Sequence, residues 1–279
     1  MRVVPIERAG DPRVVDYRDL READLRDASG LFIVEGRLNV KRLLGGSRFT
    51  ARSVFVTPAA LAALEPTLER SAGCPAIFVA EPSVLKEVVG YDLHRGCLAA
   101  AERGVVESLD QALASAAGAD GSRLWIALER VGNPENVGGI FRNALAFCAD
   151  RLLLTPHCAD PLYRKTVRVS MGAALRVPFA RAPEGAAAMH RLRDAGFCIV
   201  ALSAARDATP LPDFAPASDR LVLWLGSEGD GLAEATLRDA DHRLTIPMAP
   251  GIDSLNAATA SGIALHHLAR QLGRLGAPA

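Results

Sequence analysis

Three separated segments of the sequence combine glycines with side chains that can bind or react with a ligand. The first segment, Asn133 to Asn143, has the sequence N-P-E-N-V-G-G-I-F-R-N and carries the amide of Asn136 and the guanidinium of Arg142. We expect a helix to begin at Gly138 and to carry Arg142 in its early turns. An arginine beside the free N–H groups of a helix start would form a phosphate pocket. A plain loop-to-helix junction with a surface arginine is the alternative explanation.

The second segment, Gly226 to Leu232, has the sequence G-S-E-G-D-G-L. Its glycine spacing is G-x-x-G-x-G, whereas loops that bind dinucleotides have the spacing G-x-G-x-x-G. Glu228 and Asp230 also place negative charge where a pyrophosphate would lie. The segment therefore favours a neutral or cationic ligand, and S-adenosylmethionine, which has a sulfonium and no phosphate, fits this description. A sharp turn with exposed acids is the alternative.

The third segment begins with I-P-M at 246–248 and ends with S-L-N at 254–256. We expect a helix to begin there with Asp253 or Ser254 as its N-cap, and capping alone accounts for those two residues. Asn256 is harder to explain, because an asparagine in the apolar start of a helix is unfavourable unless its side chain forms a hydrogen bond. Asn256 is therefore a candidate site residue.

The elements that must position these segments alternate between strands and helices from Arg123 onward. Five apolar runs are expected to be strands: 124–128, 151–154, 197–202, 221–225 and 242–246. Runs that are apolar throughout indicate a mostly parallel sheet covered by helices on both faces, which is an α/β fold. Each of the three segments follows one of these strands, where open α/β sheets bind their ligands.

The first hundred residues predict a smaller α/β domain. Its expected strands are 31–34, 53–56, 76–79 and 96–101, with a helix over 36–44. Residues 104–122 lose β-branched side chains and collect Ala, Gly and acids, which indicates a partly helical linker. We therefore expect a domain over 1–103, a linker over 104–122 and a second domain over 123–279.

Composition limits the class of protein. Of the 279 residues 49% are hydrophobic and 23% are charged, which predicts a packed core. No apolar run is long enough to cross a membrane, and the first residues lack the apolar region of a secretory signal. The cysteines are odd in number and form no close pairs, which predicts no disulfide framework, no metal site and a reducing cytoplasm. They are Cys74, Cys97, Cys148, Cys158 and Cys198.

Positive charge is unevenly spread although the formal net charge is zero. The stretches 36–64 and 161–181 contain basic residues and no acids. Such stretches can follow a phosphate backbone, although short basic runs are also ordinary solvated surface. Aromatic residues make up only 5%, so basic side chains rather than base stacking would hold a nucleic acid. The candidate nucleic-acid-binding residues are Arg37, Lys41, Arg164 and Arg168.

Taken together, the three segments resemble the signature of the SpoU/TrmH-like group of SPOUT RNA methyltransferases. The family patterns N-x-G-x-x-x-R, G-x-E-G-x-G and I-P-M followed by S-L-N are matched by Asn136, Gly138, Arg142, Gly226, Glu228, Gly229, Gly231, 246–248 and 254–256. The likeness covers residues 124 to 268, and 30–36 more loosely resembles a ribosomal-protein-like RNA-binding module. The sequence departs from the family at Asn143, at Cys148 and at Ala257-Ala258.

The resemblance implies transfer of a methyl group from S-adenosylmethionine to RNA, a SPOUT-type domain with a C-terminal knot behind a small α/β RNA-binding domain, and a homodimer. The catalytic residues it implies are Arg142, Asn136, Glu228, Ser254 and Asn256. The cofactor-binding residues it implies are Gly226, Ile246, Met248 and Leu255. Because the pKa of an arginine exceeds about 12, Arg142 is interpreted first as a clamp on the target phosphate and ribose, and as a base only in a strongly perturbed site.

Several functions remain open at this stage. Methylation of a ribose 2′-hydroxyl in ribosomal RNA is favoured, and transfer RNA or a base target is the nearest alternative. A catalytically silent RNA-binding homologue is the alternative of another class, although retention of Arg142, Glu228 and Asn256 disfavours it. A nucleotide-dependent dehydrogenase is rejected by the spacing of the glycine loop.

Overall fold

The computed structural model describes residues 3–18, 30–71, 75–93, 96–117, 123–205 and 207–276. Cys74 and the part 118–122 of the expected linker lie outside them. The chain divides into two compact units. Unit 1 comprises Met1–Val105 and Pro161–Arg176, and unit 2 comprises Val106–Asp160 and Val177–Ala279. The polypeptide therefore passes from one unit to the other three times along its length.

Unit 1 contains a five-stranded sheet in the order β1-β4-β3-β5-β2. The strands are β1 (Val3–Pro5), β2 (Leu31–Glu35), β3 (Ala51–Val56), β4 (Ala76–Val79) and β5 (Cys97–Glu102). The helices are η1 (Pro12–Tyr17), α1 (Arg37–Leu44), α2 (Pro58–Leu68) and α3 (Pro82–Val89). β4 pairs in parallel with β1 and β3, whereas β5 is antiparallel to β2 and β3. The four expected strands are thus confirmed within two residues, and β1 adds a fifth.

A buried tyrosine anchors η1 to this sheet. The Tyr17 hydroxyl lies 2.7 Å from the Ser53 hydroxyl and accepts a hydrogen bond from the Ala100 N–H at 3.1 Å. Its ring lies 5.2 Å from the ring of Phe55, centroid to centroid. Burial raises the pKa of Tyr17 because the charged phenolate would lose its hydration.

Unit 2 contains an eight-stranded sheet in the order β11-β13-β10-β12-β7-β8-β9-β6, and every pairing described in it is parallel. The strands are β6 (Glu107–Ser108), β7 (Arg123–Leu128), β8 (Arg151–Leu154), β9 (Phe179–Arg181), β10 (Cys198–Leu202), β11 (Thr209–Pro210), β12 (Arg220–Leu225) and β13 (His242–Thr245). The five expected strands and the parallel sheet are confirmed. Of the expected linker, residues 107–116 supply β6 and α4 (Leu109–Ala116) to this unit.

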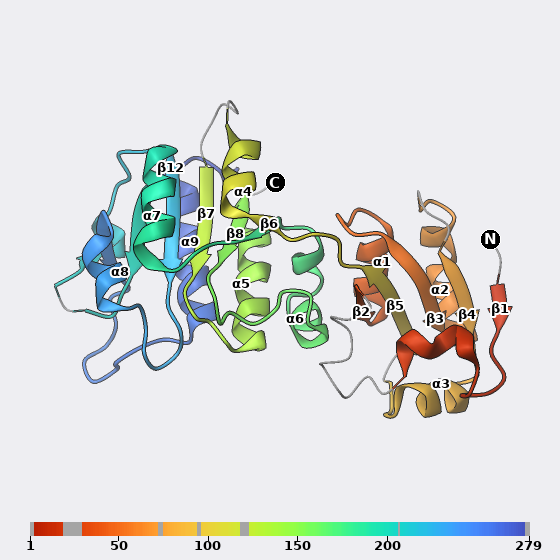
Figure 1. The fold of residues 1–279 in the computed structure, drawn as a ribbon. Helices are drawn as coiled ribbons and strands as arrows, with labels where there is room; N and C mark the ends of the chain where they lie inside the picture. The colour runs from red at the N-terminus through yellow and green to blue at the C-terminus, as the bar shows by residue number, and fades with distance from the viewer. Residues whose placement is uncertain are drawn as a thin grey trace. The chain divides into compact units, whose positions relative to one another are not determined.

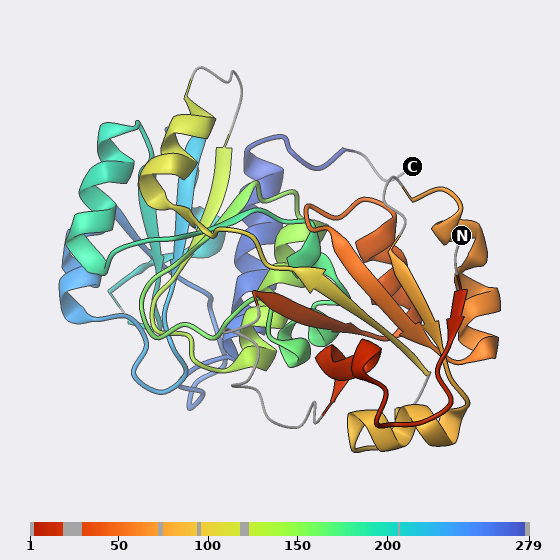
Figure 2. The same cartoon turned by 45° about the vertical axis from the view of Figure 1, so that its right-hand side comes forward.

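Helices cover both faces of the parallel sheet. They are α4, α5 (Pro134–Ala146), α7 (Gly185–Asp194), α8 (Glu234–Asp239) and α9 (Ala257–Gln271), with the short η4 (Leu211–Asp213). Trp125 and Trp224 face α4 and α7 within one apolar cluster. In Figure 1, α7 lies in front of the sheet and α9 behind it, and Figure 2 shows the same ribbon turned. This layering explains why the strands are apolar on both sides.

The part Pro161–Arg176 of the crossover between β8 and β9 belongs to unit 1 and carries α6 (Arg164–Val169) and η3 (Ala173–Leu175). Arg164 forms an ion pair with Glu35 at 3.1 Å, and Arg168 lies 3.7 Å from the same carboxylate. The Tyr91 hydroxyl donates to Glu35 at 3.1 Å and accepts from Arg164, whose guanidinium lies over the Tyr91 ring. These contacts attach the crossover to unit 1.

Two helix starts differ from the sequence expectation. The helix expected at Gly138 begins at Pro134, because Asn133 caps it by accepting the Glu135 N–H at 2.9 Å and proline suits a first helical position. Arg142 therefore lies in the third turn of α5 instead of at its start. α9 begins at Ala257, and its N-cap is Asn256 instead of Asp253 or Ser254.

Candidate functional site

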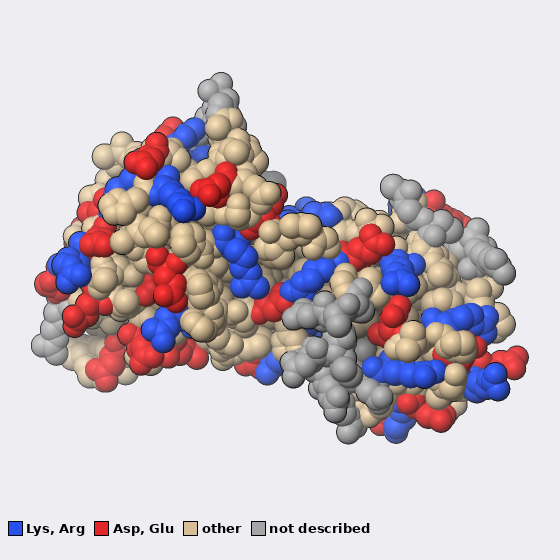
Figure 3. All heavy atoms as spheres, in the orientation of Figure 1, with Lys and Arg blue, Asp and Glu red and all other residues tan. Residues whose placement is uncertain are grey.

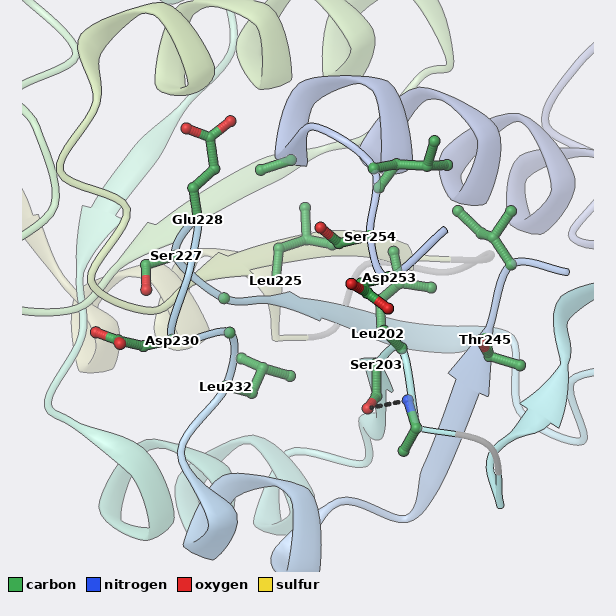
Figure 4. A pocket seen from close by; sticks show the side chains of 18 of the residues that line it. Leu202, Ser203, Leu225, Ser227, Glu228, Asp230, Leu232, Thr245, Asp253 and Ser254 are labelled. Atoms are coloured by element: carbon green, nitrogen blue, oxygen red, sulfur yellow. Dashed lines mark hydrogen bonds between the residues drawn. The ribbon is translucent and has the colours of Figure 1, made fainter. Parts of the chain in front are cut away.

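A cavity of about 710 Å³ opens at the carboxyl ends of β10, β12 and β13. Its wall consists of Leu237 and three stretches of unit 2: 202–205, 225–232 and residues between 245 and 260. Figure 4 shows the loops that follow the three strands converging on this space. The second and third sequence segments therefore meet where a ligand site is expected in a parallel α/β sheet.

The glycines of the loop after β12 are required by its shape. Ser227 and Gly231 exchange two backbone hydrogen bonds of 3.2 Å, which closes the loop into a tight turn. A Cβ atom at Gly226 would collide with the backbone of Gly231 and Leu232. Gly229 and Gly231 have φ angles of 91° and 67°, which favour glycine. The loop therefore presents backbone to the cavity.

Asn256 joins all three sequence segments. Its Nδ2 donates to Glu228 Oε1 at 2.6 Å and to Asn136 Oδ1 at 2.8 Å. Its Oδ1 accepts from the N–H groups of Ala258 at 3.0 Å and Thr259 at 3.1 Å, which caps α9. All four hydrogen-bonding positions of the Asn256 amide are therefore occupied.

Asn136 and Arg142 extend this network along α5. Asn136 is only 3% exposed, and its Nδ2 has no hydrogen-bond partner among the described residues. Arg142 is exposed, and within the described part of the chain its guanidinium makes no hydrogen bond or ion pair. Ser254 is exposed and lines the cavity. Arg142 therefore lies, without a partner among the described residues, on α5, the helix that Asn136 joins to the cavity residue Asn256.

The predicted cofactor-binding residues Gly226, Ile246, Met248 and Leu255 all line the cavity. Glu228, Ser254 and Asn256 line it too, whereas Asn136 and Arg142 do not. The structure therefore brings seven of the nine predicted residues of unit 2 to one cavity. The role of each remains a prediction.

Glu129, directly after β7, is a site residue that the sequence did not indicate. Its carboxylate is 5% exposed and accepts hydrogen bonds from Trp224 Nε1 at 3.0 Å, Thr236 Oγ1 at 2.7 Å and the Ala233 N–H at 2.9 Å. Ala233 is the N-cap of α8, just beyond the glycine loop. Glu129 therefore fixes the end of that loop. Its partners lie about a hundred positions away along the chain, so only the fold reveals it.

Two departures from the family pattern meet in space. Asn143 of α5 donates through Nδ2 to the carbonyl of Ala258 at 2.7 Å and to Ser261 Oγ at 2.9 Å. A Cβ atom at Gly139 would lie 2.6 Å from the Ala258 Cβ, so the two helices approach closely through small residues. Asn143 and Ala258 therefore form one local packing arrangement.

The predicted RNA-binding residues all lie in unit 1. Arg37 and Lys41 are exposed and one turn apart on α1. Arg164 and Arg168 face Glu35 instead, so part of their charge is balanced within the protein. On the face shown in Figure 3, acidic and basic side chains are interspersed, in agreement with the zero net charge. Contact with RNA remains a prediction for all four.

Searches for membrane and metal features were negative over the residues that the structure describes. No helix there is long and apolar enough to cross a membrane. In the same residues, no group of three or more His, Cys, Asp and Glu side chains is arranged to hold a metal ion. Cys97, Cys148, Cys158 and Cys198 are free thiols, of which Cys148 is exposed.

The parallel sheet and its cavity define an α/β fold of the SPOUT methyltransferase class. The model of the SpoU rRNA Methylase family matches residues 123–266. An uncharacterized tRNA/rRNA methyltransferase of Mycobacterium tuberculosis is 42% identical over 272 residues, which cover 95% of this chain and 91% of the relative. The chain therefore belongs to the SpoU family of RNA methyltransferases, whose members use S-adenosylmethionine.

Solved structures agree over nearly the whole chain. An rRNA methyltransferase from Sinorhizobium meliloti has a TM-score of 0.78 and 26% identity, covering 98% of this chain and 99% of that one. The SpoU methyltransferase AviRb from Streptomyces viridochromogenes, in complex with AdoMet, has a TM-score of 0.75 and 26% identity, covering 94% and 98%. Both units, and not only the parallel sheet, therefore have counterparts in this group.

Proposed function

We propose that this protein methylates a ribose 2′-hydroxyl of RNA, with ribosomal RNA as the favoured substrate. The observation that carries the proposal is the uncommitted guanidinium of Arg142 on α5, the helix whose Asn136 is bonded to the cavity residue Asn256. A cation on the helix that is bonded to a cavity residue suits a polyanionic substrate that presents a hydroxyl next to a phosphate.

The cavity suits S-adenosylmethionine in size and in charge. Its volume of about 710 Å³ falls within the range of roughly 300–1,000 Å³ that small-molecule sites occupy. Glycine-loop backbone and apolar side chains form much of the wall, which suits adenosine. We propose that Gly226, Ile246, Met248 and Leu255 hold this cofactor, which supplies an activated methyl group when bound.

The residues of the chain would position the RNA and its hydroxyl. We propose that Arg142 binds the phosphate beside the target ribose and stabilises negative charge as the hydroxyl loses its proton. An oxygen–carbon bond forms as the carbon–sulfur bond breaks, and the proton leaves to solvent. Asn136, Glu228 and Asn256 would hold the start of α9 and with it Ser254 and Leu255, so the reacting groups stay aligned.

Unit 1 is proposed as the RNA-binding unit, with Arg37 and Lys41 on α1 as its exposed cations. Ribosomal RNA is favoured because the two-unit chain resembles an rRNA methyltransferase over 98% of its length. A transfer RNA or a base target is the alternative, since relatives carry the joint name tRNA/rRNA methyltransferase. We place the protein in the cytoplasm, where both RNAs are found.

We also propose a homodimer. The proposal rests on the resemblance to SpoU/TrmH-like enzymes, and Ile263 of α9, which is 42% exposed, is the side chain chosen to test it. Sedimentation equilibrium of the full chain tests this proposal. A monomer over the micromolar range would contradict it, and Ile263→Asp is expected to weaken a dimer that forms.

The decisive experiment measures transfer of labelled methyl from S-adenosylmethionine to total RNA of a strain lacking the protein. Alkali-resistant label in one RNA species establishes ribose methylation and identifies the RNA. Arg142→Ala is expected to lower the rate about a hundredfold or more, as loss of a transition-state charge contact does. Arg238→Ala, which removes an exposed arginine of α8, is the matched control and is expected to retain activity.

Three results would contradict parts of the proposal. Label that alkaline hydrolysis releases in mononucleotides, instead of in alkali-resistant dinucleotides, would indicate a base target. Full activity of Arg142→Ala would remove the arginine from the mechanism. No transfer together with no cofactor binding by calorimetry would leave an RNA-binding protein with a methyltransferase fold.

A further inference from the structure

We propose that Asp253 makes the cavity selective for a positively charged ligand, so that S-adenosylmethionine binds more tightly than its demethylated product, S-adenosylhomocysteine. This inference rests on the proposed role of the cavity as the cofactor site. It concerns a property that the SpoU signature does not include, because Asp253 precedes the S-L-N pattern.

The charges that line the cavity have one sign. Glu228, Asp230 and Asp253 are among its wall residues, and in the described wall no Lys, Arg or His accompanies them. Glu228 is bonded to Asn256, whereas Asp230 and Asp253 make no ion pair within the described residues. β13, one of the three strands that end at the cavity, has one arginine, Arg243, which is paired with Asp207 at 2.8 Å. Among the described residues, the cavity wall therefore has three carboxylates and no basic side chain.

Asp253 is the acid placed to act on a ligand. Figure 4 shows its side chain in the middle of the cavity wall, between Leu202 and Ser254, while Glu228 and Asp230 extend to the sides of the glycine loop. A capping role does not explain Asp253, because Asn256 caps α9. Its carboxylate is exposed and makes no hydrogen bond within the described structure. It is therefore available to a ligand.

The size of the cavity sets how far this charge can act. A sphere with the volume of about 710 Å³ is about 11 Å across. The Debye length at physiological ionic strength is about 8 Å, so Asp253 interacts with a ligand charge in its own part of the cavity, whereas a charge at the opposite wall is largely screened.

The two forms of the cofactor differ by one unit of charge. S-adenosylmethionine has a sulfonium, an ammonium and a carboxylate, while the product keeps the last two and has a neutral thioether. On methyl transfer the sulfur keeps the electron pair of the broken carbon–sulfur bond, and the RNA hydroxyl releases a proton. The positive charge therefore leaves the cavity as that proton, and the carboxylates lose an attractive partner. Product release is favoured at each turnover.

The test is calorimetric binding of three ligands to the full-length protein without RNA. They are S-adenosylmethionine, S-adenosylhomocysteine and sinefungin, an analogue in which an amine carries the positive charge in place of the sulfonium. We expect the thioether product to bind up to about fivefold more weakly than the other two, because a charge contact with an exposed carboxylate contributes up to about 1 kcal/mol. Raising the salt concentration is expected to narrow the difference.

Variants assign the effect to one residue. Asp253→Asn keeps the shape of the side chain and is expected to reduce the preference to about twofold or less. Asp230→Asn is expected to have a smaller effect, because its side chain extends to the side of the loop. Asp213→Asn, an exposed acid of η4 outside the cavity, removes the same charge from the protein and is expected to leave the preference unchanged.

The outcomes separate this inference from the proposed function. Equal affinity for all three ligands, or a preference unaltered in a folded Asp253→Asn variant, overturns the charge selectivity and leaves the cofactor site intact. Failure of all three ligands to bind overturns the assignment of the cavity itself, and the inference falls with it.

Discussion

At the scale of single residues, Asn256 has two structural roles that a deletion would remove together. Asn256 caps α9 through its Oδ1 and connects Glu228 and Asn136 through its Nδ2. Truncation of Asn256 removes both functions, so a change that keeps one of them is more informative.

Asn256→Asp keeps the capping oxygen but replaces the donor with a second carboxylate facing Glu228. We expect its affinity for S-adenosylmethionine to fall about tenfold or more, because like charges at hydrogen-bond distance separate the loops. Asn256→Ala is expected to lose about 1 kcal/mol of stability from the missing cap. Calorimetry and urea unfolding measure the two quantities. An aspartate variant that binds the cofactor normally would show that the Glu228 contact is dispensable.

Glu129 gives a second prediction at this scale. In Glu129→Gln, the amide N–H₂ would face at least one of the three donors that the carboxylate binds. Because two donors cannot bond to each other, we expect a loss of about 2 kcal/mol in the free energy of unfolding. Thr236→Val removes one donor and leaves the carboxylate two others, so about 1 kcal/mol is expected. Urea unfolding tests both. Equal stability of the glutamine variant and wild type would mean that the carboxylate is not needed to hold the loop.

At the scale of elements, α5 and α9 form a contact in which small residues replace large ones. Gly139 faces Ala258, and Asn143 bonds to the backbone of the same turn. Close approach brings Asn136 within 2.8 Å of Asn256, so the spacing of the helices determines whether the network of the site can form.

Gly139→Ala tests this spacing. Alanine is normally favoured over glycine within a helix by about 1 kcal/mol. Here its Cβ would lie 2.6 Å from the Cβ of Ala258, so we expect destabilisation instead of stabilisation. Ala258→Gly removes the obstructing atom, and the double variant is expected to recover much of the loss. Thermal unfolding of the two single variants and the double variant measures the coupling. Additive effects would show that the helices do not meet at this point.

The sequence predicted elements better than it predicted contacts. Long apolar strands such as β7 and β12 were identified because burial on both faces leaves a continuous signal. β6, β9 and β11 have only two or three residues, too few for any periodicity, and their pairing depends on neighbours far along the chain. Asn136, Glu228 and Asn256 were each identified from motifs. Their mutual hydrogen bonds follow from the parallel sheet and the return of the chain after β13, which no local pattern encodes.

Helix starts were missed for a similar reason. The helix was expected to begin at Gly138, yet Asn133 caps it and the following proline begins it. Asp253 and Ser254 both suit an N-cap, and the choice of Asn256 depends on Glu228 and Asn136 being close enough to accept its N–H groups. Local propensity cannot select one N-cap among several suitable residues when the choice depends on partners far along the chain.

At the scale of the whole molecule, the two units contain different chromophores. The three tyrosines, Tyr17, Tyr91 and Tyr163, belong to unit 1, and the two tryptophans, Trp125 and Trp224, belong to unit 2. Tyrosine absorbance therefore reports on one unit and tryptophan fluorescence on the other in the same sample.

This separation predicts the response to alkali. Burial raises the pKa of Tyr17, and burial with the nearby Glu35 raises the pKa of Tyr91 to about 12. Above the ordinary value of about 10 the unfolded chain loses these protons while the folded chain keeps them, so stability is fully present below that pH and falls as pH rises further. We expect unit 1 to unfold in a cooperative step of tyrosine ionisation.

An alkaline titration measures both signals together. The tryptophan fluorescence is expected to change only after the tyrosine step. Tyr17→Phe is the control, since it removes one ionising group. Its unfolding step is expected at a higher pH than that of a protein that keeps Tyr17 and has the same stability at neutral pH. Gradual ionisation of all three tyrosines near their ordinary pKa, with no loss of structure, would contradict the prediction.

The crossover that places Pro161–Arg176 in unit 1 affects the order in which this protein can fold during its synthesis. The ribosome releases Val105 long before Arg164, so the first sheet emerges without the partner of Glu35. By the time Arg176 has left the exit tunnel, β7 and β8 have already been translated and await β9. A fragment ending at Val105 would lack Arg164 and Arg168, the arginines that neutralise Glu35. Unit 1 can therefore complete its folding only after residues 161–176 have been synthesised, although its sheet is translated first.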